Sequence, residues 1–335
     1  MSSVAKITRK DVAARAGVSE TIVSNVLNNN RYVAEDKRQR VLRAVQELNY
    51  HPNNNARALR GKFSGHIMFI ADDIANEHFG HLVSKMDEFG HDQGYLISLT
   101  GYWNSEDFIR RVISRQPDGI VISSNSFRRE YIRMLADCGI PVVLIGSRDY
   151  EDIDSKVSVV YTGLDEGIRK GVQLLAQKGR KHLVHIDRIS AKGHFSNMQD
   201  LRYRSFCEAV LDNGMTLSKD SIISGCHNED ELLASIEARI QSGAPIDGII
   251  ARNDALAAVA VTAIRNCGLS VPDDIAVVGF DNSRISRITY PQLTTVQIDQ
   301  AKVASAIFST LNSMQNGGEP VHLHFQTILI ERKST

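Results

Sequence analysis

The spacing of apolar residues differs between the first fifty residues and the rest of the chain. Over the first fifty residues, apolar positions recur at helical spacing in three groups: Val12, Ala13 and Ala16; Ile22, Val23, Val26 and Leu27; and Val41, Leu42, Val45 and Leu48. Thr8-Arg-Lys-Asp11 fits a capping box, Gly17 interrupts the pattern, and Ser19 can cap a second helix. The pattern therefore predicts three helices whose apolar residues face inward, the first two joined as a helix-turn-helix.

From Phe63 onward, short apolar runs alternate with amphipathic stretches. The runs predict strands at 66–70, 95–99, 119–123, 142–145, 182–186, 221–223, 248–251 and 275–278. The stretches between them predict helices near 79–93, 105–115, 129–138, 163–178, 200–213, 229–242 and 255–267. Such alternation is typical of parallel sheets with helices on both faces.

The two halves of this α/β region are similar. Gln116-Pro-Asp-Gly-Ile-Val-Ile-Ser123 is echoed by Ala244-Pro-Ile-Asp-Gly-Ile-Ile-Ala251. We therefore expect an α/β core of two similar parallel-sheet lobes, preceded by a small all-α helix-turn-helix head. In such a core, a ligand binds between the lobes, at the carboxyl ends of the strands.

Composition and charge exclude some classes of function and favour others. No apolar run of the 335 residues approaches the ~18–20 needed to cross a bilayer, and the polar N-terminus lacks a secretory signal. The four cysteines form no C-x-x-C pair, as expected of a reduced, cytoplasmic protein. Residues 1–62 hold 12 basic and 5 acidic side chains, a charge of +7, and the remainder carries −7. A basic head on an acidic body favours a polyanionic partner for the head.

Several linked motifs carry a family resemblance. They are I7-T-R-K-D-V-A-A-R-A-G-V-S19, V23-S-N-V-L-N28, R40-V-L-R-A-V-Q-E-L-N-Y-H-P-N53, A56-R-A-L-R-G61, P291-Q-L-T-T295 and L329-I-E-R-K-S-T335. Together they resemble the lac repressor/gal repressor family of bacterial regulators. The resemblance implies a DNA-binding head at 1–50, a hinge segment at 51–62, and a two-lobed core at 63–335 like that of periplasmic sugar-binding proteins.

The same resemblance implies a function. It is that of a sequence-specific DNA-binding transcriptional regulator, of repressor type. A small polar ligand such as a sugar, bound between the core lobes, would control its affinity for operator DNA. Family members act as homodimers on near-palindromic operators, and we expect a dimer here because no leucine heptad tail follows L329-I-E-R.

The second helix is the expected reader of the major groove, and its outward residues are Glu20, Thr21, Ser24, Asn25 and Asn28. The family often has Arg where Asn25 stands; Asn suits adenine better than guanine. Glu20 is alternatively a solvated charge near a helix start. Further DNA-binding candidates are Thr8, Ser19, Asn29, Arg31, Tyr32, Asn53 and Ala58.

Two segments of the head carry open alternatives. The polar loop 28–32 either holds phosphates or is a solvated turn. In the hinge segment, Leu59 matches the leucine that wedges between central base steps, and the alternative is a plain linker whose Leu packs on the body.

Effector-binding candidates are carried over from the family residue by residue. Arg202, Asn253, Asp254 and Asp281 match its polar ligand contacts, although residues of these types at strand ends are often loop or capping residues. Asn76 and Phe79 match an N-P-F-F turn, in which Glu77 and His78 replace the Pro and the first Phe. His227 falls near an aromatic position that often stacks on a sugar ring; a surface His is the alternative.

Two other classes of protein compete with a regulator. A pure solute-binding protein would need export, against which the basic head and the missing signal argue. An enzyme on an α/β scaffold would need a catalytic constellation, and the chain has no G-x-S-x-G, H-E-x-x-H, P-loop or G-x-G-x-x-G. We therefore expect no catalytic residues, no cofactor and no metal.

Overall fold

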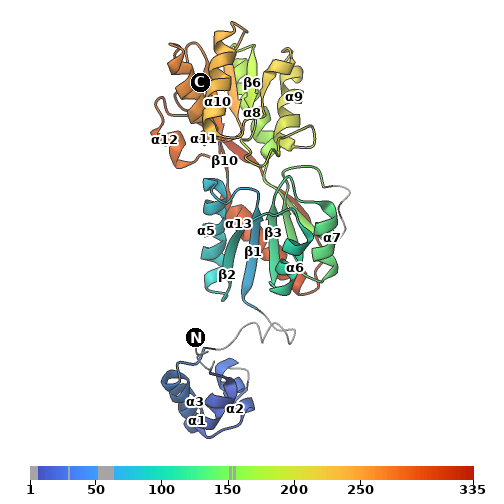
Figure 1. The fold of residues 1–335 in the computed structure, drawn as a ribbon, viewed down its shortest axis with the longest axis vertical. Coiled ribbons are helices and arrows are strands. Elements are labelled where there is room, and N and C mark those ends of the chain that lie inside the picture. The colour runs from blue at the N-terminus through green and yellow to red at the C-terminus, as the bar shows by residue number, and fades with distance from the viewer. Residues whose placement is uncertain (1–6, 29–30, 52–63, 151–152, 154–155) are drawn as a thin grey trace. The chain divides into compact units, whose positions relative to one another are not determined.

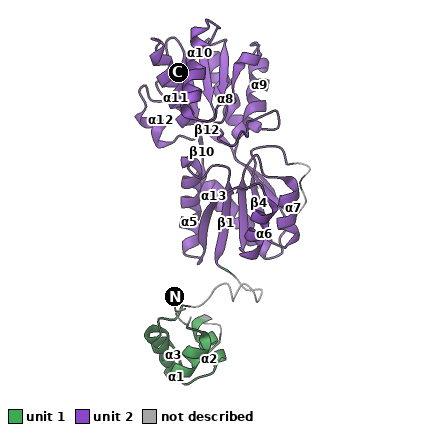
Figure 2. Cartoon of the chain, in the orientation of Figure 1, with its two compact units in different colours: residues 1–64 green, residues 65–335 purple. Residues whose placement is uncertain are grey.

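The computed structural model describes residues 7–28, 31–51, 64–150, 153 and 156–335. The chain separates into two compact units, Met1–Ser64 and Gly65–Thr335, drawn in different colours in Figure 2. Four predicted DNA-binding residues, Asn29, Asn53, Ala58 and Leu59, lie outside the described residues. The division of the head from a hinge segment at residue 50 therefore stays a prediction.

The first unit contains three helices, α1 (Arg9–Ala16), α2 (Glu20–Asn28) and α3 (Glu35–Glu47). The Asp11 carboxylate accepts hydrogen bonds from the Thr8 backbone N (2.7 Å) and hydroxyl (2.6 Å), as the predicted capping box requires. Gly17, at φ 64°, ends α1 in the left-handed conformation that glycine adopts without strain.

The core of the first unit follows the predicted apolar stripes with one exception. Its buried residues are Val12, Ala13, Ala16, Val23, Val26, Val41, Ala44 and Tyr50. The prediction that Leu42 faces inward is wrong, because its side chain is 44% exposed. The buried stripe of α3 runs through Val41, Ala44, Val45 and Leu48, and Leu42 lies one position, or about 100°, outside it.

The second unit contains two six-stranded sheets (Figure 1). The first has the strand order β11-β5-β4-β3-β1-β2, and all of its pairs are parallel. Its strands are β1 (His66–Ala71), β2 (Leu96–Gly101), β3 (Gly119–Ser123), β4 (Val142–Ile145), β5 (Ser158–Tyr161) and β11 (His322–His324). Its helices are α5 (Glu77–His91), α6 (Glu106–Ser114), α7 (Arg129–Asp137) and α13 (Gln300–Gln315). We call this layered body the first lobe.

The second sheet has the order β12-β10-β9-β8-β6-β7, and only its edge pair β10–β12 is antiparallel. Its strands are β6 (Leu183–Ile186), β7 (Ile222–Ile223), β8 (Gly248–Ala251), β9 (Ala276–Phe280), β10 (Thr294–Ile298) and β12 (Thr327–Ile330). Its helices are α8 (Leu164–Gln177), α9 (Leu201–Asp212), α10 (Glu229–Gln241), α11 (Asp254–Asn266) and α12 (Arg284–Ile288), with a short 3-10 turn at Lys219–Ser221. This is the second lobe.

The chain passes between the lobes three times, from β5 to α8, from β10 to α13 and from β11 to β12. The predicted fold class is confirmed, and each predicted strand and helix overlaps an observed one. None of the eight predicted strands overlaps β5, β10, β11 or β12, and none of the predicted helices overlaps α12 or α13.

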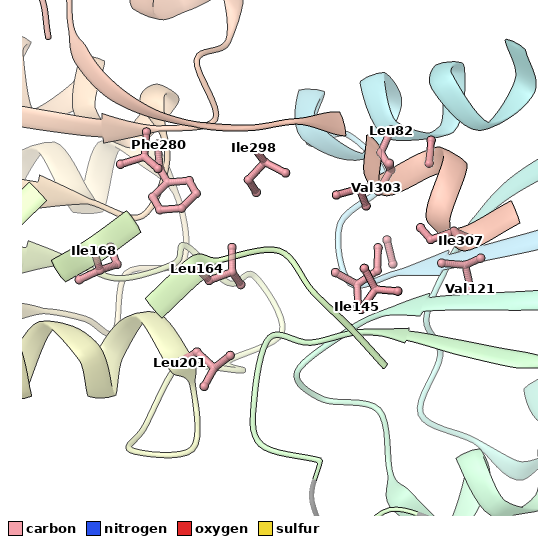
Figure 3. Packing of buried hydrophobic residues seen from close by; sticks show 14 of the residues in the cluster. Leu82, Val121, Ile145, Leu164, Ile168, Leu201, Phe280, Ile298, Val303 and Ile307 are labelled. Carbon is pink, nitrogen blue, oxygen red and sulfur yellow. The ribbon is translucent and has the colours of Figure 1, made fainter. Parts of the chain in front are cut away.

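A hydrophobic cluster joins the lobes (Figure 3). Leu82, Val303 and Ile307 enter it from the first lobe, and Ile168 and Phe280 enter it from the second. Burying apolar surface that both lobes supply favours the arrangement in which the lobes contact each other. It also brings together the polar residues that follow their strands.

Candidate functional site

The exposed face of α2 is polar. Glu20 and Thr21 are exposed, Ser24 and Asn25 are half-buried, and Val23 and Val26 are buried beneath them. The hydroxyl of Ser19 accepts a hydrogen bond from the Ile22 backbone N (3.4 Å) at the start of the helix. An α2 anchored on the core by its apolar stripe can therefore present Glu20, Thr21, Ser24 and Asn25 to a groove.

The other described DNA-binding candidates lie at the end of α2, just after it in the chain, and at the start of α1. Tyr32 is 94% exposed and Arg31 is also exposed. Asn28 is the last residue of α2. The Thr8 hydroxyl donates to Asp11 and so belongs to the cap of α1. An exposed tyrosine ring beside a guanidinium is suited to contacts with phosphate and sugar.

In the second unit, charged side chains stand directly after buried strands of both sheets. Asp72 follows β1, Asp187 and Arg188 follow β6, Arg252 follows β8, and Asp281 follows β9. The carboxyl ends of parallel strands share one edge of a sheet, which is where ligands bind in open α/β sheets. The two edges meet at the junction of the lobes, because Arg188 of the second lobe lies 3.5 Å from Asp72 of the first.

The centre of the junction is an ion-pair network that we call the interlobe cluster, formed by Asp72, Asn125, Asp187, Arg188, Asp200 and Arg252. The Asp200 carboxylate lies 2.9 Å from Arg188 and 3.0 Å from Arg252, and it accepts a hydrogen bond from the Asn125 amide of the first lobe. Burial alone would raise the pKa of Asp200, but the two guanidinium groups hold it well below its usual range.

Asp200 also shapes the backbone. Its carboxylate accepts from the Arg202 backbone N (2.9 Å) and thereby caps α9. The next residue, Leu201, donates its backbone N–H to the Ser147 carbonyl of the first lobe (3.0 Å). The start of α9 is thus fixed to both lobes, and α9 carries the candidate Arg202.

Arg202 and Asp281, both predicted to bind the effector, lie near each other at the junction. The Arg202 guanidinium lies over the Phe280 ring, 4.7 Å from its centroid, and burial lowers the pKa of Arg202 to about 10. The Asp281 carboxylate lies 3.3 Å from Nδ1 of His78 across the junction. Burial would raise the pKa of Asp281, but nearby His78, Arg202 and Arg252 outweigh it, so this pKa is below the ordinary value.

Within the described residues, Nε of Arg202 has no hydrogen-bond partner, and Oδ1 of Asp281 has none beyond its 3.3 Å contact with Nδ1 of His78. Buried polar atoms are nearly always hydrogen-bonded, so such exceptions in a protein call for a reason. One is a donor and the other an acceptor. A ligand that can both accept and donate hydrogen bonds would satisfy them.

Asn76 and Phe79 lie at the start of α5. The Asn76 side chain caps α5 by accepting from the His78 backbone N (2.9 Å), and Phe79 packs against Phe69 with ring centroids 5.9 Å apart. Glu77 accepts from the Arg284 backbone N of the second lobe (3.2 Å). The two replacements in the N-P-F-F turn, Glu77 and His78, thus both make polar contacts across the junction.

Asn253 and Asp254 are occupied by structural contacts. Asn253 caps α11 by accepting from the Leu256 backbone N (2.9 Å). The Asp254 carboxylate accepts from the Thr295 hydroxyl (2.5 Å) and the Ser283 backbone N (2.7 Å). Burial raises the pKa of Asp254 to about 7, although these hydrogen bonds act in the opposite direction. The structure therefore assigns Asp254 to bracing the loop after β9, the loop that holds Asp281.

His227 is exposed at the edge of the second lobe. Its Nδ1 lies 3.1 Å from the Ser190 carbonyl, and Phe195 meets its ring edge-on with centroids 5.5 Å apart. His227 thus contacts the segment between β6 and α9 that also supplies Ser196 to Asp187 and Asp200.

Sequence reasoning predicted none of the six residues of the interlobe cluster. Asp72, Asp187, Arg188 and Arg252 each follow a buried apolar run by one or two positions, the same signal that singled out Asp281. Asn125 follows β3 in the same way. The strand-end signal could not identify Asp200, because Asp200 precedes a helix and does not follow a strand.

Two searches of the described residues found nothing. No group of three or more His, Cys, Asp or Glu side chains is placed to hold a metal ion in the part of the chain that the structure describes. Among those same residues, no helix combines the length and apolarity required to cross a bilayer.

Known proteins are similar to the chain over nearly its whole length. Residues 8–53 match the family described as bacterial regulatory proteins, lacI family, and residues 172–335 match a periplasmic binding protein-like domain. The HTH-type transcriptional regulator RegA of Clostridium acetobutylicum is 30% identical over 97% of this chain and 98% of its own length. The HTH-type transcriptional repressor PurR of Pasteurella multocida is 27% identical over 98% of each.

Solved structures share the fold. A lac repressor dimer, described as bound to operator and the anti-inducer ONPF, superimposes with a TM-score of 0.81 at 23% identity, over 98% of this chain and 99% of its own. The curated relatives above are named as regulators and repressors and not as enzymes. These names distinguish a regulator from an enzyme on the same scaffold.

Proposed function

Because this chain belongs to the lacI family of bacterial regulatory proteins, we propose that it is a ligand-controlled transcriptional repressor of the cytoplasm. Its head binds a near-palindromic operator as part of a homodimer. Its two lobes bind a small polar metabolite, a sugar or a related compound, at their junction. The ligand changes the affinity of the head for the operator.

The observation that supports ligand binding is the spare hydrogen-bonding capacity of Arg202 and Asp281 at the junction. Among the described residues, Nε of Arg202 has no hydrogen-bond partner, and Oδ1 of Asp281 has only the 3.3 Å contact with Nδ1 of His78. A guanidinium offers donors in a planar fork and a carboxylate accepts, so together they suit vicinal hydroxyl groups. The neighbouring Phe280 ring supplies an apolar surface.

Ligand binding can control the affinity of the head for DNA because the two binding equilibria are thermodynamically linked. A ligand that binds one arrangement of the lobes better than another shifts the equilibrium towards it by its differential affinity. The contacts that differ are those that cross the junction: Asp200 to Asn125, Arg188 to Asp72 and His78 to Asp281. By reciprocity, operator DNA must change the affinity for the ligand by the same factor.

DNA binding is tested by selection from a random library, followed by titration of the selected site at several salt concentrations. We expect a site with two-fold symmetry, two chains per site, and an affinity that falls steeply with salt as counterions are released. Binding of a single chain to one half-site with full affinity would contradict the dimer. The salt response follows from the charge of +7 on residues 1–62.

Ligand control is tested with Arg202→Ala and Asp281→Ala, after a thermal-shift screen of sugars, nucleosides and amino acids has identified the effector. Each variant should bind the effector about ten- to a hundredfold more weakly, since a hydrogen bond to a charged group contributes about 1.5–3 kcal/mol. Operator affinity without effector should stay within a few-fold. Arg204→Ala is the matched control, because Arg204 lies on the same helix and only approaches Glu208 at 3.9 Å. If both variants instead lose operator binding and melting temperature with unchanged effector affinity, the two residues only brace the fold.

A further inference from the structure

The first lobe contains a pocket of about 500 Å³ that is separate from the interlobe cluster. It lies between the sheet, at β1 and its edge strand β2, and helix α6. None of the effector-binding candidates lines it. A volume of this size is within the range of about 300–1,000 Å³ that small-molecule sites occupy.

One part of the pocket is apolar and aromatic. Met68 and Val112 line it and are almost fully buried, at 6% and 3% exposure. Phe108 lines it as well, and its ring packs edge-on against Tyr102 with centroids 6.1 Å apart. Trp103 lines it and is 65% exposed, so a large aromatic ring is open to a ligand there. This part suits the hydrocarbon or aromatic body of a ligand.

The basic residues of the pocket come from β1 and from α6 and the residue after it. His66, Arg111 and Arg115 line the pocket, and none of its lining residues is acidic. His66 Nε2 lies 2.8 Å from the Ser98 hydroxyl. The Arg115 guanidinium donates to the Arg111 carbonyl (2.8 Å), and the described contacts give it no carboxylate partner.

Two carboxylates lie near the pocket, and one of them, Asp107, pairs with Arg111 of the lining. The pair spans one helical turn, and 70% of the Asp107 side chain is exposed to solvent, where an ion pair is weak. Asp118 accepts hydrogen bonds from the backbone N of Gly65 (2.6 Å) and of His66 (3.2 Å). The pocket therefore has an apolar wall on one side and, at His66, Arg111 and Arg115, more basic than acidic side chains.

We propose that this pocket binds an amphipathic organic anion, an apolar or aromatic ring that carries a carboxylate. The ring lies against Trp103 and Phe108, and the carboxylate lies at Arg111 and Arg115. A sugar has no comparable apolar body, so this ligand differs in class from the one at the lobe junction. The site is thus a second ligand-binding site of the chain.

Two contacts connect the pocket to other parts of the second unit. Lys192, from the second lobe, lies 4.7 Å from the Trp103 ring and donates to the Tyr102 carbonyl (3.3 Å). His66 is the first residue of β1, and its backbone N donates a hydrogen bond to the Asp118 carboxylate. A ligand in the pocket touches Trp103 and His66, and so reaches a contact between the lobes and the start of the first sheet.

The test uses 4-phenylbutyrate and its neutral amide, 4-phenylbutyramide, on the full chain. Trp103 is the only tryptophan in the sequence, so its fluorescence reports binding at the pocket directly. We expect a saturable change in fluorescence with phenylbutyrate, at least a tenfold weaker response to the amide, and a stoichiometry of one per chain by calorimetry.

Three variants locate the site. Arg111→Met with Arg115→Met should weaken phenylbutyrate binding at least tenfold, whereas Arg110→Met, on the same helix but outside the pocket, should leave it within twofold. Thr100→Phe should block the pocket from its edge strand, where aromatic residues are well tolerated. Circular dichroism confirms that each variant is folded, and the blocking variant keeps the test decisive if the double variant does not fold.

Three results would overturn the proposal: no saturable binding at millimolar phenylbutyrate, equal affinity for acid and amide, or unchanged affinity in folded Thr100→Phe. Arg202→Ala separates the two sites. It should leave phenylbutyrate binding intact, and loss of binding in that variant would place the anion at the lobe junction instead. The outcome does not depend on whether the lobe junction binds a sugar.

Discussion

The buried carboxylate of Asp200 offers the sharpest test of the lobe junction. Asp200→Asn keeps the size of the side chain and its capping role, because Asn and Asp cap helices equally well. The substitution removes the negative charge that lies 2.9 Å from Arg188 and 3.0 Å from Arg252, and it replaces one acceptor oxygen by an NH2 donor. All three side chains are largely buried, at 3%, 14% and 12% exposure. Two guanidinium groups would then remain in the junction without their shared partner.

The expected loss is large. Removing one partner of a buried ion pair costs about 3–5 kcal/mol. Asp72 and Asp187, each 3.5 Å from one of the two arginines, compensate part of it, so we expect about 3 kcal/mol. For a unit of this size, 1 kcal/mol shifts the melting temperature by roughly 2–4 °C, which gives a decrease of roughly 6–12 °C.

The dependence on pH gives an independent readout of the same charge. The pKa of Asp200 is lower in the folded chain than its unfolded value of about 3.9. The carboxylate therefore stabilises the folded state fully above that unfolded value, and this contribution is lost as the pH falls through the folded pKa. In Asp200→Asn, this part of the acid destabilisation should be absent.

The assay is urea unfolding at neutral pH, with Asp299→Asn as the matched control. Asp299 also caps a helix, accepting from the Lys302 backbone N (3.1 Å), and pairs with Lys302, but its side chain is 37% exposed. An exposed pair of this kind contributes about 0–1 kcal/mol. If both variants lose the same small amount of stability, the interlobe cluster contributes no net stabilisation through its charges and the argument fails.

Four further expectations concern single residues. Gly279→Ala should cost about 1–3 kcal/mol in urea unfolding, because a Cβ would lie 2.2 Å from the Asp254 carboxylate; a neutral result would contradict that packing. The pKa of Asp254 is about 7 in the folded chain, above its unfolded value, so Asp254 stabilises the folded state at acidic pH. This contribution is lost as the pH rises through 7. Thermal unfolding at pH about 5 and about 8 should show the loss in the native chain but not in Asp254→Asn. Ala34→Ser should stabilise the head by about 1 kcal/mol in thermal unfolding, since Ala34 caps α3 without a side-chain hydrogen bond. Asn25→Arg should shift one half-site position towards guanine in a binding selection, and an unchanged site would exclude base reading by Asn25.

The fold was predictable wherever burial follows hydrophobicity. The strand β3 is buried along its whole length, and three consecutive apolar residues lie between Gly119 and Ser123, so its pattern predicts it. The strand β10 is buried except at Gln297, which is half-buried, but it begins with Thr294 and Thr295. Their hydroxyls are satisfied by Thr335 and Asp254, which lie 41 positions away in each case. Burial that depends on such distant partners leaves no local hydrophobic signal.

The candidate site was predictable in part for the same reason. Resemblance pointed to Arg202, and resemblance together with a strand end pointed to Asp281; the structure brings both to the junction beside the Phe280 ring. The same reasoning pointed to Asp254, whose carboxylate instead accepts hydrogen bonds from Ser283 and Thr295. A strand end shows that a side chain lies near the edge of a sheet. Which partner it then binds is decided by residues far along the chain.

The order of the chain has a consequence for synthesis on the ribosome. The first lobe needs α13 and β11, yet 138 residues of the second lobe separate α13 from the end of β5. At about 5–20 residues per second, that delay is roughly 7–28 s. During it, the apolar surface that α13 covers, including the site on Gly119 where Leu311 packs, stays exposed on an unfinished lobe. The lobe that begins first is therefore completed late, and the nascent chain is open to chaperones in the interval.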